Sequence, residues 1–349
     1  MIARSRLTIA ALLLLAAPAV SWAQRPKDIL WTHAFDLAAR KVGEAEFTKT
    51  TQKYGVEAFK DTNNGLGVYI SEKGSLAAAH GFDKIKAGEK SKGPDWLTGL
   101  DLPARKAGEK EFTKDTKVFP LEVFKDSNTD NWIYITGGRD GAAGAPEKGL
   151  IASCPVTLKT TTSNQAPKWV HSFDLNVRKG GVKEWKDATK IGVEVYYDAN
   201  TGNLVYITET GAIAVIPSEG AAEPVKGAGK APEWLHGLDL ACRKSKETNF
   251  TKDTKRFGVE VFHDANNGNI VLMCETGAIA VVKGAKDTKA PTSMVKQPTW
   301  QHGLNLKARV FGEAEFSDTT RVWGAECFRD DNLGITIYIG EEGSLTAIK

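Results

Sequence analysis

The chain has 349 residues, of which 41% are hydrophobic and 26% charged, and its net charge at pH 7 is +3. This near balance of basic and acidic residues argues against a nucleic-acid partner, whose binding would require many neutralised phosphates. Lysine and glutamate are interspersed along the chain, as is typical of a solvated protein surface.

The first 23 residues predict a secretory signal of the Sec type. A basic start, MIARSR, precedes an apolar run at residues 7–20, and Ser21 and Ala23 supply the small residues of a signal-peptidase site. The run is too short for a stable membrane span. We expect cleavage after Ala23, which leaves residues 24–349 as a periplasmic or extracellular protein with no stable membrane insertion. A retained signal anchor is the alternative.

Five similar units follow the signal, and each opens on a tryptophan, as in WTHAFDLAARK and WLHGLDLACRK. The units span residues 31–79, 96–154, 169–217, 234–283 and 300–349. The second unit carries an insertion, GGRDGAAGAPEKG, at residues 137–149. The spacers between units are rich in glycine, proline and lysine, so we do not expect them to be helical.

The fourth unit illustrates the expected elements in chain order. Trp234, His236, Leu238 and Leu240 alternate with other residues, which predicts a first strand with these side chains on one face. ETNFTKDTK is a polar loop with one aromatic residue, and RFGVEVFHD is a second strand. After the turn ANNG come a third strand, NIVLMCE, a tight turn and a fourth strand, AIAVV. These short turns predict an antiparallel meander.

A lone four-stranded sheet cannot bury both faces, and repeated units solve this by packing against their neighbours. We therefore expect an all-β protein of five tandem repeats, each of about four antiparallel strands, arranged as a five-bladed β-propeller-like toroid. The fragments NLVYITETGAIAVI (203–216) and GVYISEKGSLAAA (67–79) resemble the strand–turn–strand core of PQQ-type and tachylectin-type propeller blades in architecture. The alternative is five small domains on a string, which the long spacers favour.

An arginine at the end of strand one and a glutamate in strand two recur in every unit. Because an unpaired charge inside a packed sheet is destabilising, we expect structural ion pairs. The alternative is a repeated pocket in which arginine grips an acidic ligand. We expect each arginine to pair either with the glutamate of its own unit or with that of a neighbouring unit. The residues are Arg40 and Glu57, Arg105 and Glu122, Arg178 and Glu194, Arg243 and Glu260, and Arg309 and Glu326.

An aspartate ends strand two in every unit, in motifs such as DANNGN, and we expect it to cap the turn that follows. A calcium loop is the alternative, although a third acidic ligand and a distal glutamate are missing. Histidine occupies one position of strand one in four units, with Thr98 in the second. We expect a core histidine bonded to backbone carbonyls. If strand one lined a central channel, the histidines would ring the axis and could bind metal.

The four cysteines are Cys154, Cys242, Cys274 and Cys327, and their spacing does not resemble a zinc site. Cys327 stands where other units have valine or alanine, which indicates a small buried hydrophobic residue. Cys242 and Cys274 share one unit and could pair in an oxidising compartment. We therefore expect no metal and no cofactor.

A second aromatic residue recurs within the polar loop after strand one, where it is either a plug over the blade or a platform for sugar rings. These candidate ligand-binding residues are Phe47, Phe112, Trp185, Phe250 and Phe316. The chain contains no nucleophile elbow, zinc-protease motif or phosphate loop, and we expect no catalytic residue.

The sequence therefore predicts an exported, non-enzymatic repeat protein that binds a ligand or envelope polymer, such as a polysaccharide, through repeated equivalent surfaces. Two alternatives remain. One is a hydrolase or lyase with a single cleft on a propeller scaffold, where the insertion in the second unit breaks the symmetry. The other is a purely structural repeat protein of the envelope.

Overall fold

The computed structural model describes most strands and their tight turns. The described residues are 29–38, 53–71, 74–84, 92–103, 118–136, 151–155, 165–176, 190–208, 211–218, 222–225, 229–241, 256–274, 276–284, 296–307, 322–340 and 343–349. They form strands β1 to β20 and one 3-10 helix, η1 (Phe82–Lys84). None of the described residues forms a helix long and apolar enough to cross a membrane.

The strands form five four-stranded sheets, here called blades 1 to 5. Blade 1 contains β1 (Leu30–Ala38), β2 (Lys53–Asp61), β3 (Leu66–Ser71) and β4 (Leu76–Ala79); blade 2 contains β5 (Asp95–Pro103), β6 (Val118–Asp126), β7 (Asn131–Thr136) and β8 (Ile151–Pro155); blade 3 contains β9 (Lys168–Asn176), β10 (Lys190–Asp198), β11 (Asn203–Thr208) and β12 (Ile213–Pro217); blade 4 contains β13 (Glu233–Ala241), β14 (Arg256–Asp264), β15 (Asn269–Cys274) and β16 (Ile279–Val282); blade 5 contains β17 (Thr299–Lys307), β18 (Val322–Asp330), β19 (Ile335–Gly340) and β20 (Leu345–Ile348).

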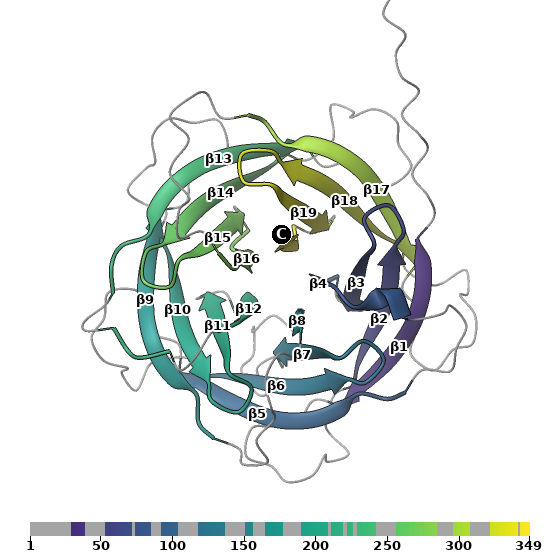
Figure 1. The fold of residues 1–349 in the computed structure, drawn as a ribbon, viewed down its shortest axis with the longest axis horizontal. Coiled ribbons are helices and arrows are strands. Elements are labelled where there is room, and N and C mark those ends of the chain that lie inside the picture. The colour runs from purple at the N-terminus through teal and green to yellow at the C-terminus, as the bar shows by residue number, and fades with distance from the viewer. Residues whose placement is uncertain are drawn as a thin grey trace, which may run out of the picture.

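The blades are arranged radially, with the first strand of each outermost and the fourth innermost (Figure 1). Each blade is an antiparallel meander in chain order, as predicted. The innermost strands contact their neighbours all the way around the axis, and β20 contacts β4, so the ring is closed. The protein is therefore a five-bladed β-propeller, and the arrangement of separate domains on a string is wrong.

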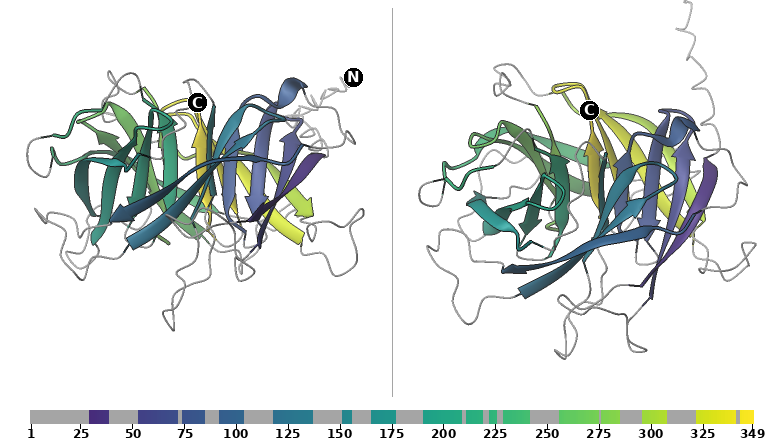
Figure 2. Two further views of the ribbon diagram at one scale, coloured as in Figure 1. Left: turned by 90° about the horizontal axis from the view of Figure 1, so that it is seen from below. Right: turned by 60° about the horizontal axis from the view of Figure 1, so that its bottom comes forward.

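The strands of a blade alternate in direction, so the ring has two different rims. The connection from strand one to strand two and the turn from strand three to strand four lie at one rim, here called the segment rim. The turn from strand two to strand three and the end of strand four lie at the opposite rim, here called the spacer rim because the spacers begin there. In Figure 2 (left) the C-terminus, just past β20, lies at the upper side, which is the spacer rim.

The first strand of every blade contains a β-bulge directly after its tryptophan. In β13, Trp234 pairs with Phe262 and His236 pairs with Val261, which leaves Leu235 as the extra residue. An extra residue reverses the alternation of faces, so the tryptophan and the histidine lie on opposite faces of the blade. The predicted common face for these two residues is therefore wrong, because strict alternation cannot register an inserted residue.

The hydrophobic core consists of five layers, each between the facing surfaces of two adjacent blades. Between blades 4 and 5, for example, Leu238, Val259 and Leu272 pack against Phe328 and Ile337. Each sheet thus buries both faces only because it has a neighbour on each side, as the repeat pattern predicted.

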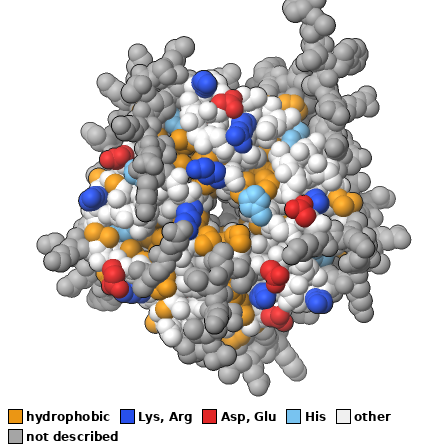
Figure 3. All heavy atoms as spheres, in the orientation of Figure 1, with side chains coloured by type: hydrophobic (Ala, Val, Ile, Leu, Met, Phe, Trp, Pro, Cys, Tyr) orange, Lys and Arg blue, Asp and Glu red, His pale blue; other side chains and the backbone are white. Residues whose placement is uncertain are grey.

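Little room remains on the axis among the described residues. The innermost strands surround a space of about 40 Å³, which suits one or a few water molecules and is too small for a sugar ring. Figure 3 shows a small opening near the centre of the face, bordered by hydrophobic side chains and, on one side, by basic ones. Small side chains let the five strands approach one another here, among them Ala77, Ala152, Ala214, Ala280 and Ala347.

Candidate functional site

A row of three side chains crosses strands one, two and three of each blade and faces the next blade around the ring. In blade 5 the row is His302, Cys327 and Tyr338, which are paired across β17, β18 and β19. The corresponding rows are His33, Ala58, Tyr69 in blade 1; Thr98, Val123, Tyr134 in blade 2; His171, Val195, Tyr206 in blade 3; and His236, Val261, Leu272 in blade 4.

The histidine of each row contacts the aspartate that ends strand two of the next blade. Nε2 of His33 lies 3.0 Å from Oδ2 of Asp126, and the His171–Asp264 distance is also 3.0 Å. The His236–Asp330 and His302–Asp61 distances are both 2.8 Å, and the aspartates are completely buried. The expected partner, a backbone carbonyl, is therefore wrong: the partner is a carboxylate from the neighbouring blade.

The tyrosine of the row donates to the same carboxylate. Tyr69 donates to Asp126 at 2.7 Å and Tyr338 donates to Asp61 at 2.7 Å. Between blades 2 and 3, where Thr98 replaces histidine, Tyr134 still donates to Asp198 at 3.0 Å. Between blades 4 and 5 the histidine is present and Leu272 replaces the tyrosine. Each junction therefore keeps at least one donor from this row to the buried aspartate.

The junctions favour a charged carboxylate and neutral tyrosines. Burial acts to raise the pKa of Asp126, but hydrogen bonds from His33, Thr129 and Tyr69, together with the charge of His33, bring that pKa down to about 2. Burial and the charge of Asp126 hold the pKa of Tyr69 well above its usual range. The pKa of Asp264 is lowered in the same way by His171. Because these groups are buried, they suit cohesion between blades rather than chemistry on a dissolved substrate.

The aspartate also caps the turn that follows it, as predicted. The backbone N–H of Asn63 donates to Oδ1 of Asp61 at 2.9 Å, and the amide of the Asn63 side chain donates to the same oxygen at 3.0 Å. The other oxygen, Oδ2, is occupied by His302 and Tyr338. The carboxylate bonds the backbone of its own turn, and the third acidic ligand and distal glutamate of a calcium loop are missing, so the turn cap is favoured over the calcium loop.

An asparagine two residues after the aspartate fixes the preceding spacer, a role that the sequence interpretation missed. Asn128 donates to the carbonyl oxygen of Lys92 at 3.0 Å and accepts from its N–H at 3.0 Å. The same two-bond contact joins Asn200 to Gln165, Asn266 to Lys230 and Asn332 to Lys296. The sequence pattern could have indicated this role, because asparagine recurs at this position in every unit.

The strand-two glutamates are buried, and each accepts a hydrogen bond from the indole N–H of its own blade's tryptophan. The distances are 2.6 Å for Trp31–Glu57, 2.5 Å for Trp96–Glu122, 2.8 Å for Trp169–Glu194, 2.6 Å for Trp234–Glu260 and 2.5 Å for Trp300–Glu326. The arginines that we paired with these glutamates lie outside the described residues, so the arginine–glutamate pairs stay a prediction.

Other predicted features also lie outside the described residues. They are the signal at residues 1–23, the insertion at 137–149, Cys242, and the aromatic residues Phe47, Phe112, Trp185, Phe250 and Phe316. Cys274 is a free thiol in the structure. Strand one is outermost, so the histidines do not ring the axis, and the idea of a metal-lined channel is wrong.

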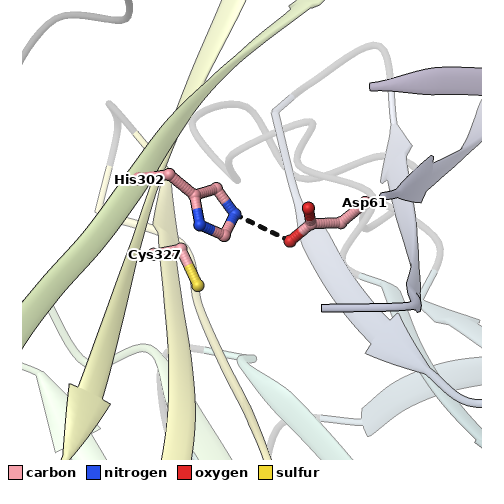
Figure 4. Close-up of side chains that lie close together, drawn as sticks. All are labelled: Asp61, His302 and Cys327. Carbon is pink, nitrogen blue, oxygen red and sulfur yellow. Dashed lines mark hydrogen bonds and ion pairs between the residues drawn. The ribbon is translucent and has the colours of Figure 1, made fainter. Parts of the chain in front are cut away.

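One junction adds a cysteine to the row. Where blade 5 meets blade 1, the buried side chains of Asp61, His302 and Cys327 converge, with their ligand atoms within 4.8 Å of one another (Figure 4). They come from β2, β17 and β18, which lie near opposite ends of the chain. Burial and the charge of Asp61 raise the pKa of the Cys327 thiol well above its usual range. An accessible, activated nucleophile is therefore excluded here.

The fold and its junctions define a five-bladed β-propeller whose blades are joined by buried histidine–aspartate and tyrosine–aspartate contacts. No protein-family model and no curated protein sequence matches the chain. Among solved structures, the chain is similar to a catalytically inactive virginiamycin B lyase from Staphylococcus aureus with quinupristin, at 12% identity and a TM-score of 0.13, covering 92% of this chain and 70% of that one. A second structure of that lyase matches at 12% identity and a TM-score of 0.11, covering 92% and 74%. This likeness carries no argument about function.

Proposed function

We propose that this protein is an exported, non-enzymatic binding protein that uses the segment rim of its propeller to hold an extended envelope polymer, with a polysaccharide as the favoured ligand. The observation that carries the proposal is the placement of the five segments that contain Phe47, Phe112, Trp185, Phe250 and Phe316. Each of these segments joins strand one to strand two, so all five are attached to the ring at the same rim.

The strand bounds support this placement in every blade. In blade 1 the segment leaves β1 after Ala38 and returns to β2 at Lys53, both at the segment rim. The insertion at 137–149 falls between β7 and β8, which places its attachment points at the same rim. The five segments and the insertion therefore leave the ring and return to it at the same rim.

The recurring polar residues elsewhere are already used for structure. Aspartate, histidine and tyrosine join the blades, glutamate accepts from tryptophan, and asparagine holds the spacer at the spacer rim. The space on the axis is too small for a sugar. Of the features that repeat in every unit, the aromatic segments remain as the place for a ligand.

The chemistry of the segments fits a sugar polymer. An aromatic face stacks on the apolar face of a sugar ring, and the lysine and aspartate residues of the same segments can bond to hydroxyl groups. A single site of this kind is shallow and weak. Five on one rigid ring gain avidity for a polymer that can reach several of them, and none for a monosaccharide.

The direct test is calorimetric titration of residues 24–349 with dextran, with polygalacturonate and with the corresponding monosaccharides. We expect binding of at least one polymer, much weaker binding of the monosaccharides, and loss of polymer binding when the five aromatic residues are changed to alanine together. Asp83→Ala, an exposed change at the spacer rim, is the matched control and should bind normally. Equal affinity for polymer and monosaccharide, or cleavage of the polymer, would contradict the proposal.

Trp185 provides an independent check on the same surface, because it is the one tryptophan among the five aromatic residues. Subtracting the emission of Trp185→Phe from that of the unchanged protein gives the emission of this side chain. We expect it to be quenched by acrylamide and protected by the polymer. An emission that acrylamide does not reach would identify a buried plug. Protein sequencing of the exported chain, expected to begin at Gln24, tests the signal.

A further inference from the structure

We propose that the junction between blade 5 and blade 1 is a structural zinc site, formed by His302, Asp61 and Cys327, that fastens the last blade of the propeller to the first. This site is independent of the sugar-binding surface. It lies between the facing sheets of blades 5 and 1 rather than at the segment rim, and its ligands are buried.

The side chains already point toward one another. In Figure 4 the His302 ring faces the Asp61 carboxylate across the junction, with the Cys327 sulfur beside the ring. Nε2 of His302 lies 2.8 Å from Oδ2 of Asp61, and the ligand atoms of all three residues lie within 4.8 Å of one another. Zinc bonds of about 2.0–2.3 Å in a tetrahedron place ligand atoms about 3.3–3.7 Å apart. Side-chain movements of about 1 Å therefore suffice to surround the metal.

The donor set suits zinc. One imidazole nitrogen, one sulfur and one carboxylate oxygen are the three ligand types that zinc takes in proteins. The thiolate and the carboxylate together balance the charge of the cation, so the buried site is electrically neutral when it is loaded. The thiol proton leaves as the metal binds, and the proton that Nε2 of His302 shares with Asp61 moves to Nδ1, because only a thiolate and an unprotonated ring nitrogen are ligands.

Two further side chains support the site. The hydroxyl of Tyr338 lies 2.7 Å from Oδ2 of Asp61, and Oε1 of Gln301 lies 3.2 Å from the Cys327 sulfur, so two oxygen atoms border the fourth position. The amide of Asn64 donates to the Cys327 sulfur at 3.3 Å and to the Tyr338 hydroxyl at 3.1 Å. A donor that holds a sulfur in place is typical of the shell around a metal.

The junction between blades 3 and 4 is a natural control, because it contains the same frame without the cysteine. His171 lies 3.0 Å from Asp264, and Tyr206 donates to Asp264 at 2.9 Å. Asn267 donates to the Tyr206 hydroxyl at 3.2 Å, as Asn64 does to Tyr338. Val195 occupies the position of Cys327. The shared histidine, tyrosine, aspartate and asparagine therefore hold two blades together without a metal. The added sulfur of Cys327 is what completes the proposed zinc site.

The position of the site in the chain gives the metal a structural purpose. A spacer of the chain joins each blade to the next, whereas blades 5 and 1 lie at the two ends of the repeat, and among the described residues their contact consists of side chains and strand packing. A metal held by both blades adds its binding free energy to ring closure. The metal enters while the ring is closing, before its ligands become buried.

The test is zinc content after refolding residues 24–349 with zinc sulfate and removing loose metal by gel filtration. We expect about one zinc per chain in the unchanged protein and none in Cys327→Val, which should still fold because valine occupies this position in blades 2, 3 and 4. Val195→Cys should raise the content to about two. Refolding with cobalt instead should give sulfur-to-cobalt charge-transfer absorption that Cys327→Val lacks.

Thermal stability gives a second readout of the same site. Zinc should raise the melting temperature of the unchanged protein and leave that of Cys327→Val unchanged. A refolded, native protein that retains no zinc would overturn the proposal, as would equal zinc in the unchanged protein and Cys327→Val. A folded Val195→Cys chain that gains no metal would overturn the role given to the shared histidine–tyrosine–aspartate–asparagine frame.

Discussion

The imidazole of His171 in β9 lies 3.0 Å from the carboxylate of Asp264 at the end of β14, and both side chains are completely buried. The contact joins blade 3 to blade 4. It repeats between three other pairs of blades, including the pair that closes the ring. The cohesion of the propeller therefore depends on polar contacts inside apolar layers, where the loss of one partner is strongly destabilising.

Asp264→Ala should lower the free energy of unfolding by about 3–5 kcal/mol, because it leaves His171 and the Tyr206 hydroxyl buried without their acceptor. The matched control is Glu223→Ala, which removes one partner of the exposed Lys168–Glu223 pair at 3.1 Å and should change the stability by less than about 1 kcal/mol. Urea unfolding followed by fluorescence measures both. Equal effects of the two substitutions would contradict a buried, stabilising junction.

Stability should fall in acid as the buried aspartates take up protons. The pKa of Asp126 is lowered from 3.8 to about 2, so the unfolded chain binds more protons than the folded protein between these values. The contribution is complete above about pH 4 and is lost as the pH falls toward 2. It amounts to about 2 kcal/mol for this residue. Melting temperatures between pH 7 and pH 2 test the window.

Asp126→Asn is the control for that pH dependence. The amide keeps the shape of the side chain and cannot titrate, so the variant should be less stable at pH 7 and should lose less stability between pH 4 and pH 2. If the variant and the unchanged protein lose the same stability over this window, other groups are responsible.

Glycine is required at the turn after strand two for its backbone conformation. Gly65 has a φ of 71°, and a Cβ added there would meet nothing within 4 Å. Gly65→Ala should therefore destabilise the protein by about 1 kcal/mol through backbone strain alone. Gly93 also has open space around it and lacks a positive φ, so Gly93→Ala should be neutral or slightly stabilising. Melting temperatures of the two variants isolate the effect of backbone conformation, because neither added methyl group meets another atom. Equal melting temperatures would contradict the prediction.

Gly67 is required for a different reason, which is contact with Phe82. A Cβ on Gly67 would lie 1.8 Å from the Phe82 ring, which η1 places against blade 1. Gly67→Ala should destabilise the protein by about 1–3 kcal/mol, although replacing a strand glycine with alanine ordinarily stabilises by about 0.5–1 kcal/mol. In the background Phe82→Leu, which vacates part of that volume, the same substitution should be less destabilising. Strict additivity of the two changes would contradict the contact.

The sequence by itself determined the architecture of this protein. Five tryptophan-led units with strand alternation and short turns predicted five antiparallel meanders, and the inability of a single sheet to bury two faces predicted the ring. The aspartate cap was also predictable, because an aspartate bonds within a few residues of itself, to the backbone of its own turn.

Only the tertiary structure decided which partner each buried polar residue has. His33 and Asp126 are adjacent in space because two blades pack face to face, and no pattern within one unit registers that contact. The bulge after each tryptophan moves that side chain to the other face of the strand and leaves no mark in the residue types. The simple alternation of residues in the sequence therefore put Trp234 on the same face as His236, which is wrong. Cys327 looked like a small hydrophobic substitute in its own unit. Ring closure brings it beside Asp61, a residue from the opposite end of the fold, because the first and last blades must meet for either to bury its exposed face.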